Sequence, residues 1–239
     1  MVINDSFIDK NGKKYDGVIE KAFEKDELFD IGKFKHQTER EKTVFGKENG
    51  VYIYQDIEND NLAYRIYDEF AEYGFNGYHD DVLIYELNKR RENVKLTDFP
   101  NGIVTYNGNI IGQIIPYYPN SETIFSYAKE TNNINIIKYY RRMLDILIEL
   151  YNNGIIYCDA HAKNFLIVNN KVKLIDFDFS LMDFNNYKYK YENMINTFIG
   201  MVNTLNEIIN VSYKVSYNDI RDLQDIEEVV LEMEKKLIK

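Results

Sequence analysis

The sequence predicts an α+β fold, with a strand-rich N-terminal part followed by a helical C-terminal part. Short β-branched and aromatic runs separated by polar turns recur up to residue 115. After residue 134, apolar residues recur at the spacing of helices. Between the two parts, Pro116 and Pro119 bracket a short segment, and we expect a connector at 116–120.

The N-terminal part is expected to contain two hairpins and one helix. The strands are expected at residues 51–54, 62–67, 103–106 and 110–115. The first two are joined by a polar turn, and the last two by Asn107, Gly108 and Asn109. Asn-Gly supplies the positive φ angles of tight hairpin turns, so the second hairpin has the clearer signal. Apolar residues within 81–91 predict a short helix.

The C-terminal part is expected to be mainly helical. Helices are predicted at residues 134–153, 194–209 and 220–237, and short strands at 165–168 and 172–175. Gly154 follows the first helix and is expected to cap its C-terminus, since glycine readily adopts the left-handed conformation found there.

Composition excludes several classes of protein. The formal net charge of -10 argues against a nucleic-acid-binding protein, which needs a basic surface. Cys158 is the only cysteine, so no intrachain disulfide can form. The chain shows no signal peptide and no apolar run long enough to span a membrane. We therefore expect a soluble protein of the cytoplasm, either of its own cell or, as a delivered effector, of another cell.

Three polar residues in the second half form the pattern that carries chemistry. Asp159 and Asn164 lie five residues apart in a loop after a long helix, and Asp176 follows an apolar strand. Phosphoryl transfer from ATP needs a carboxylate to orient the attacking hydroxyl and accept its proton. It also needs hard oxygen ligands to hold Mg²⁺ against the phosphates. These three residues supply both sets of groups.

The segment from Tyr157 to Asn164, followed by Asp176, Phe177 and Asp178, resembles the catalytic loop and the metal-binding motif of the protein-kinase-like superfamily. The resemblance implies a single two-lobed domain over residues 1–239. It would have a β-rich N-lobe at about 1–115, a hinge at about 116–120 and a reduced helical C-lobe at about 121–239. ATP and Mg²⁺ are the implied ligands.

The resemblance also implies roles for the polar residues of the second half. Asp159 would be the catalytic base, and Asn164 and Asp176 the metal ligands. His161 would contact the γ-phosphate or the substrate.

In the first half, Arg65 takes the position of the ATP-binding lysine of the superfamily. Glu86 is expected to pair with it, with Glu69 and Glu72 as alternatives. Gly46 and Gly50 would belong to the loop that covers the phosphates, and an ordinary hairpin turn is the other reading of that segment.

The chain departs from the superfamily pattern at three further points. Tyr157 replaces the loop histidine, and Asp178 replaces the glycine after Phe177. The activation segment, at 179–191, is short and lacks Ala-Pro-Glu.

The expected function is an ATP-dependent phosphotransferase acting on a hydroxyl group, with Ser or Thr of a protein as the favoured acceptor. The small C-lobe favours a protein acceptor, since it leaves little room to build a small-molecule pocket. His161 favours the alternative of a small-molecule kinase resembling aminoglycoside and choline kinases. Arg65 and the incomplete glycine loop leave open a pseudokinase, a binding module without turnover.

Overall fold

The computed structural model describes residues 2–8, 12, 14–23, 35–42, 48–56, 59–67, 81–100, 102–106, 109–131, 134–177, 180–181 and 187–237. The chain divides into two compact units. The first contains Met1–Arg91 and Phe99–Pro119, and the second contains Glu92–Asp98 and Asn120–Lys239. The longer segment of the second unit thus begins at Asn120, within the connector expected at 116–120.

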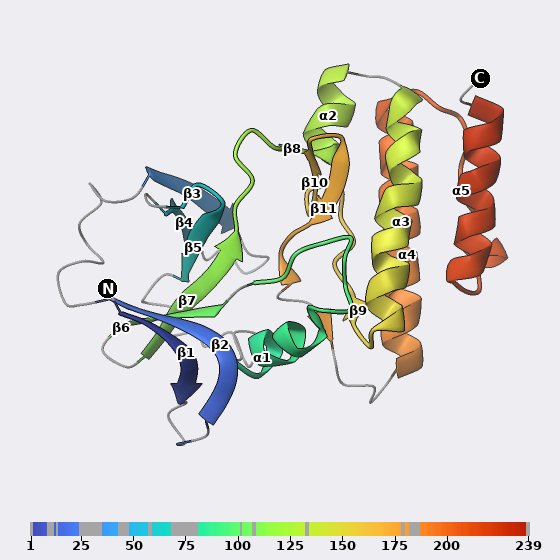
Figure 1. The fold of residues 1–239 in the computed structure, drawn as a ribbon. Helices are drawn as coiled ribbons and strands as arrows, with labels where there is room; N and C mark the ends of the chain where they lie inside the picture. Colours follow the sequence, from blue (N-terminus) through green and yellow to red (C-terminus); the bar gives the residue numbers. More distant parts are fainter. Residues whose placement is uncertain are drawn as a thin grey trace. The chain divides into compact units, whose positions relative to one another are not determined.

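The first unit is built on a seven-stranded sheet in the order β1-β2-β6-β7-β5-β4-β3 (Figure 1). Its strands are β1 (Val2–Ile8), β2 (Lys14–Phe23), β3 (Lys35–Lys42), β4 (Glu48–Gln55), β5 (Leu62–Tyr67), β6 (Gly102–Tyr106) and β7 (Asn109–Pro116). All neighbouring strands are antiparallel except β2 and β6, which are parallel. The two hairpins expected from the sequence are therefore confirmed as the pairs β4–β5 and β6–β7.

The parallel pair depends on a glycine. Gly102 lies opposite Ile19, and a Cβ at Gly102 would overlap the carbonyl oxygen of Ile19. Glycine lets the two backbones approach because it has no side chain there. In this way β2 joins the sheet beside β6, although some eighty residues separate them in sequence.

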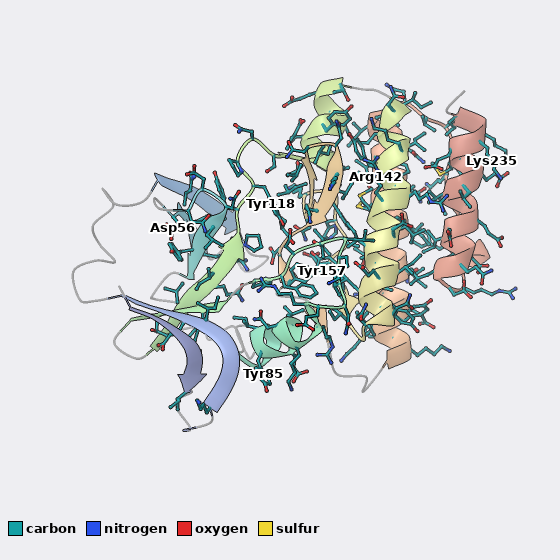
Figure 2. All side chains as sticks on the ribbon, viewed as in Figure 1. Asp56, Tyr85, Tyr118, Arg142, Tyr157 and Lys235 are labelled. Atoms are coloured by element: carbon teal, nitrogen blue, oxygen red, sulfur yellow. The ribbon has the colours of Figure 1, made fainter. Side chains whose placement is uncertain are left out.

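The β4–β5 turn is held by a buried carboxylate. Asp56 is 7% exposed, and its side chain accepts hydrogen bonds from the hydroxyl of Tyr64 and from the backbone N–H of Asn59 (3.1 Å; Figure 2 labels Asp56). The backbone N–H of Asp56 donates to the carbonyl of Leu62 (2.9 Å). These bonds compensate for burying a charge and fix the register of the hairpin.

The helix α1 (Asp81–Arg90) matches the helix expected at 81–91. Its residue Ile84 packs against Ile103 of β6 in a buried cluster, with Tyr85 and Ile110 at the edge. The helix thus packs on the sheet face to which Ile103 points.

The second unit contains the helices α2 (Ile124–Thr131), α3 (Ile137–Asn152), α4 (Tyr187–Ile208) and α5 (Leu223–Leu237). Short strands complete it: β8 (Glu122–Thr123), β9 (Ile156–Tyr157), β10 (Phe165–Val168), β11 (Lys171–Leu174) and β12 (Ser180–Leu181). Figure 1 shows α3 and α5 side by side, and the two helices are in contact. The three predicted helices and two predicted strands are confirmed as α3, α4, α5, β10 and β11, whereas α2, β8, β9 and β12 were not predicted.

Two turns of the second unit follow the sequence closely. Gly154 has a φ of +77° after α3, as expected for a C-terminal cap. Asn169 and Asn170, with φ of 50° and 62°, form the two-residue connection between β10 and β11. Asparagine tolerates this left-handed conformation, and two such residues in succession match a tight hairpin turn.

Residues Glu92–Asp98 follow α1 in sequence but are anchored in the second unit. The Glu149 carboxylate accepts from the backbone N–H groups of Lys95 (3.0 Å) and Leu96 (2.9 Å). The buried hydroxyl of Thr97 bonds both the N–H and the carbonyl of Leu174, each at 3.0 Å. We call this segment the anchor segment.

The connection between α4 and α5 is held by two buried asparagines. The side chain of Asn203 exchanges two hydrogen bonds with the backbone of Val215, at 2.8 and 3.0 Å. Asn206 donates to the carbonyl of Tyr213 (2.8 Å) and accepts from the hydroxyl of Tyr140 on α3 (3.1 Å). These bonds satisfy the backbone of a segment that lacks regular structure.

Some boundaries differ from the expectation. The helix expected at 194–209 begins at Tyr187. Residues 187–191, which were expected to end the activation segment at 179–191, therefore belong to α4, and the activation segment is shorter than predicted. The ring of Tyr191 packs on Tyr151 at 5.0 Å, and its hydroxyl accepts from the N–H of Leu223 (3.1 Å), which gives this polar first turn its tertiary contacts. Among the described residues, no helix is long and apolar enough to cross a membrane.

Candidate active site

The candidate catalytic loop runs from Cys158 to Asn164 between two strands of the second unit. β9 enters the loop and pairs with β12, and β10 leaves it and pairs with β8 and β11. Within the loop, Ala160 and Ala162 are buried, whereas His161 and Lys163 are exposed. The alternation anchors the loop by its alanines and turns its polar side chains outward.

Asp159 and Asn164, which lie five residues apart in the loop, are in direct contact. The side-chain nitrogen Nδ2 of Asn164 donates to Oδ2 of Asp159 (2.8 Å) and also lies 3.0 Å from the Asp159 carbonyl oxygen. The backbone supports this geometry, because the Asn164 N–H donates to the carbonyl of His161 (2.9 Å). The bond fixes the orientation of the carboxylate that we predicted to be the catalytic base.

His161 binds the other oxygen of the same carboxylate. Its Nε2 lies 3.0 Å from Oδ1 of Asp159, and its side chain is 64% exposed against 27% for Asp159. His161 was expected to contact the γ-phosphate or the substrate. This contact with phosphate or substrate stays a prediction. With His161 and Asn164 bound, each carboxylate oxygen of Asp159 has one hydrogen-bond partner and, with two lone pairs, can accept another bond.

Tyr157 links the loop to the segment that carries Asp176. Its side chain is fully buried, and its hydroxyl lies 2.9 Å from the carbonyl oxygens of both Ile175 and Asp176 (Tyr157 is labelled in Figure 2). The hydroxyl also accepts from Nδ2 of Asn164 (3.1 Å). A hydroxyl has one donor and two acceptor positions, and the Tyr157 hydroxyl acts here both as a donor and as an acceptor. From its position in the sequence, Tyr157 was expected only to replace the loop histidine, and this linking role was not predicted.

Asp176 adopts an unusual backbone conformation. Its φ is 61°, in the left-handed region, where aspartate is tolerated better than most residues. The backbone N–H of Ile175 donates to the carbonyl of Asn164 (2.8 Å), and the ring of Phe177 packs edge-on against Tyr157 at 5.8 Å. Contacts on both sides therefore hold Asp176 in place, and the predicted metal ligands Asn164 and Asp176 are joined through the backbone and through Tyr157.

Replacing Tyr157 with phenylalanine should separate the linking role of the hydroxyl from the packing role of the ring. We expect the free energy of unfolding to fall by about 0.5 to 1.5 kcal/mol, because the half-buried carbonyls of Ile175 and Asp176 lose a donor. We also expect weaker stabilisation by Mg-ATP, since Asn164 loses a partner. Thermal unfolding with and without Mg-ATP measures both effects.

A matched control for that variant is Tyr213→Phe, which removes a hydroxyl from the same unit at the α4–α5 connection. If Tyr157→Phe and Tyr213→Phe showed the same Mg-ATP stabilisation as the wild type, the linking role would be wrong.

Arg65 lies on the sheet face that α1 covers. It pairs with Ile53 of β4 on one side and with Gln113 of β7 on the other. Gln113 in turn pairs with Ile103, against which α1 packs. Directly opposed residues of antiparallel strands point to the same face, so Arg65, Gln113 and Ile103 form one row. Arg65 is half-buried in β5, and its role as the phosphate-binding cation stays a prediction.

The expected pair between Glu86 and Arg65 is not formed. The Glu86 carboxylate pairs with Arg90 (2.7 Å) and Lys89 (3.1 Å) of its own helix. These contacts, with the hydrogen bond to Arg90 as the largest cause, lower the pKa of Glu86. Local i,i+3 and i,i+4 partners on α1 therefore occupy the carboxylate, and the i,i+4 spacing of Glu86 and Arg90 was a signal in the sequence. Glu69 and Glu72 lie outside the described residues.

The two glycines assigned to a phosphate loop have different positions. Gly46 lies outside the described residues. Gly50 lies within β4, opposite Arg40 of β3, and so belongs to the strand that was expected to start after it. This corrects its location.

Cys158, next to Asp159, shows no sign of activation. Burial is the main cause that raises the pKa of its thiol, so the thiolate is disfavoured at neutral pH. Its sulfur lies 3.9 Å from the carbonyl oxygen of Lys190 on α4. This agrees with the interpretation of Cys158 as a packed side chain.

The two predicted metal ligands, Asn164 and Asp176, offer oxygen atoms, the ligands that Mg²⁺ prefers. No group of three or more His, Cys, Asp or Glu side chains gathers at a point within the part of the chain that the structure describes. The contacts of the Asn164 side chain with the loop run through Nδ2, which leaves its oxygen Oδ1 as the ligand atom. Mg²⁺ commonly takes one or two protein oxygens and completes its shell with water and phosphate oxygens. Asn164 and Asp176 fit this pattern.

Comparisons with known proteins identify the fold. No protein-family model and no curated protein matches the sequence. Among solved structures, the chain is similar to the crystal structure of the BubR1 kinase domain, with a TM-score of 0.51 and 12% identity. The match covers 85% of this chain and 84% of that chain. The chain therefore has a protein-kinase-like fold, which confirms the expected fold class, and at this identity the likeness extends to the fold alone.

Proposed function

We propose that the chain is an ATP-dependent phosphotransferase that moves the γ-phosphate to a hydroxyl group. The observation that carries this proposal is the oriented carboxylate of Asp159, bonded through Oδ2 to Asn164 and through Oδ1 to His161. A carboxylate held in this way, partly exposed and linked through Asn164 and Tyr157 to the main chain of Asp176, is suited to accept a proton at a fixed place. The kinase-like fold supports the choice of ATP as donor.

Asp159 performs the proton transfer in the proposed reaction. The hydroxyl of the acceptor approaches the γ-phosphorus, and its O–H proton passes to a carboxylate oxygen of Asp159. The new O–P bond forms as the bond between the γ-phosphorus and the bridging oxygen breaks, and ADP leaves with the electron pair of that bond. The partners of Asp159 keep the carboxylate oriented, which avoids reorganisation during the reaction.

Asn164 and Asp176 would hold Mg²⁺ in this proposal, and Arg65 would bind the phosphates of ATP. Bound Mg²⁺ would neutralise charge on the phosphate oxygens. Arg65 offers a planar set of N–H donors that matches phosphate geometry.

The favoured acceptor is a Ser or Thr hydroxyl of a protein. The described helices of the second unit, α2 to α5, follow one another without a further α-helical insertion between them, so few described elements there could build a small-molecule pocket. A pseudokinase is the second candidate, because Arg65 stands where the superfamily carries lysine and the glycine loop is incomplete. The bonded pair of Asp159 and Asn164 favours turnover over pure binding.

Incubation with labelled ATP tests the proposal. We expect label from the γ-phosphate to reach a protein acceptor or the chain itself, and label from the α-phosphate to remain on nucleotide. Transfer of α-label would indicate AMP transfer instead, and binding of Mg-ATP without transfer of either label would favour the pseudokinase.

Substitutions at Arg65 test its role in ATP binding. Arg65→Ala should weaken binding of Mg-ATP by about tenfold or more, because charge-assisted phosphate contacts each contribute about 1.5 to 3 kcal/mol. Arg65→Lys should retain part of the affinity, since an ammonium keeps the charge without the planar geometry. Calorimetric titration measures both. Equal affinities for the wild type and Arg65→Ala would assign the phosphates to another cation.

A further inference from the structure

Two exposed lysines flank one aromatic ring beside the candidate catalytic loop. Lys129, four residues after Phe125 on α2, places its Nζ 4.5 Å from the centre of the Phe125 ring. Lys163, in the loop itself, places its Nζ 5.8 Å from the same centre. We call Lys129 and Lys163 the lysine pair. The ring holds both ammonium groups within a small area through cation–π attraction.

The lysine pair is held at the candidate catalytic loop, of which Lys163 is a part. The backbone N–H of Phe125 donates to the carbonyl of Ala162 (3.3 Å), which joins the start of α2 to the loop. Thr123 caps the helix by accepting from the N–H of Ser126 (3.0 Å). Because Lys163 directly precedes Asn164, the cations border the loop that presents Asp159.

Within the described residues, no carboxylate lies within 4 Å of either ammonium group of the lysine pair. Other lysines of the same unit are neutralised, for example Lys173 by Asp98 (2.9 Å) and Lys188 by Glu192 (3.8 Å).

The acidic residues of the α2 region interact with each other. Burial, and then the charge of Glu130, raise the pKa of Glu122, so its carboxyl group is more easily protonated than an ordinary glutamate. One oxygen of Glu122 is buried without a hydrogen-bond partner. These groups therefore leave the lysine pair available to an external anion.

The lysine pair is a local positive site in a chain that is acidic as a whole. The chain carries a formal net charge of -10, so its average field repels acidic molecules. An acidic molecule can approach only where local cations outweigh that field, and the lysine pair supplies such a place beside Asp159.

We infer that the lysine pair binds acidic side chains of the acceptor, and that the acceptor is an acidic segment of a protein. This inference rests on the proposed function and specifies its substrate class. Each ammonium group can take one carboxylate close to the phosphorylated residue, and the apolar ring between them can contact the intervening side chains of an extended peptide. The two cations thus select for Glu or Asp near the acceptor hydroxyl.

Three synthetic peptides of equal length test the inference. Each has one central serine, flanked by Glu, Gln or Lys. We expect kcat/KM for the Glu peptide to exceed that for the Gln peptide by about threefold to tenfold, since exposed ion pairs contribute about 0.2 to 1 kcal/mol each. The preference should weaken at high salt, because exposed charges are screened. The double variant Lys129→Glu/Lys163→Glu should reverse the preference towards the Lys peptide.

The control variant is Lys214→Glu, which makes the same kind of charge change at an exposed lysine between α4 and α5 and should leave the preference intact. Binding of dye-labelled peptides without ATP, followed by fluorescence anisotropy, adds a readout that needs no turnover. Equal binding of the Glu and Gln peptides would overturn the inference, as would the same preference in the double variant. Preferential binding of the Glu peptide without transfer of phosphate would support the lysine pair and contradict the proposed reaction alone.

Discussion

Replacing Asp159 with alanine is expected to lower the rate of phosphate transfer by about 10²- to 10⁴-fold, the range for loss of a general base. The fold should survive, because the backbone contacts of the loop do not need the carboxylate. The N–H of His161 still donates to the Asp159 carbonyl (2.7 Å), and Asn164 still reaches that carbonyl and the hydroxyl of Tyr157. Initial rates of γ-label transfer, with circular dichroism to check folding, measure the effect.

A matched control for Asp159→Ala is Glu228→Ala, which removes an exposed carboxylate from α5 of the same unit. It should leave the rate unchanged. Turnover near the wild-type rate in a folded Asp159→Ala protein would show that the loop is not the catalytic centre.

Replacing Asp176 with asparagine is expected to abolish both turnover and the stabilisation of the chain by Mg-ATP. Asparagine is the right substitution because the φ of Asp176 is 61°, a conformation in which alanine would be strained. The chain already carries asparagine at φ of 57° and 62°, at Asn210 and Asn120. The variant therefore removes the charge and preserves the backbone.

The thermal shift gives the magnitude for Asp176→Asn. A ligand at 100 times its Kd stabilises the folded state by about 2.7 kcal/mol, and that stabilisation should be lost if Mg²⁺ no longer binds. The melting temperature without nucleotide should stay close to that of the wild type. An unchanged Mg-ATP shift in Asp176→Asn would contradict the assignment of Asp176 as a metal ligand.

The candidate site was predictable where chemistry and spacing are local. Asp159 and Asn164 are five residues apart in one loop, so their contact follows from a short turn whose backbone bonds lie between His161 and its neighbours. The strand that holds Arg65 was also predicted, because the β4–β5 hairpin has a clear sequence signal, whereas the role of Arg65 stays a prediction. The contribution of Tyr157 could not be derived from spacing, since its hydroxyl meets main-chain carbonyls eighteen and nineteen residues away.

The parts of the fold that the sequence did not reveal depend on distant partners. β3 contains no apolar alternation, and its strand is formed by pairing with β4. β2 reaches β6 only because Gly102 permits a close approach to Ile19. The eight-residue helix α2 is fixed by Thr123 and by the contact between Phe125 and Ala162. Such contacts cannot be predicted from helical or strand periodicity within a short window of the sequence.

The contacts of the anchor segment bear on which fragments of this chain can fold independently. A fragment that begins at Asn120 contains every helix from α2 to α5, yet it lacks Thr97 and the amides that Glu149 binds. Leu174 would then present an unpaired N–H and carbonyl, and the Glu149 carboxylate would lose both donors. Such a fragment should melt below the full chain and gain stability when a synthetic peptide of residues 92–98 is added. The second unit therefore needs seven residues that precede its main segment in the sequence. No single division of the chain separates the two units.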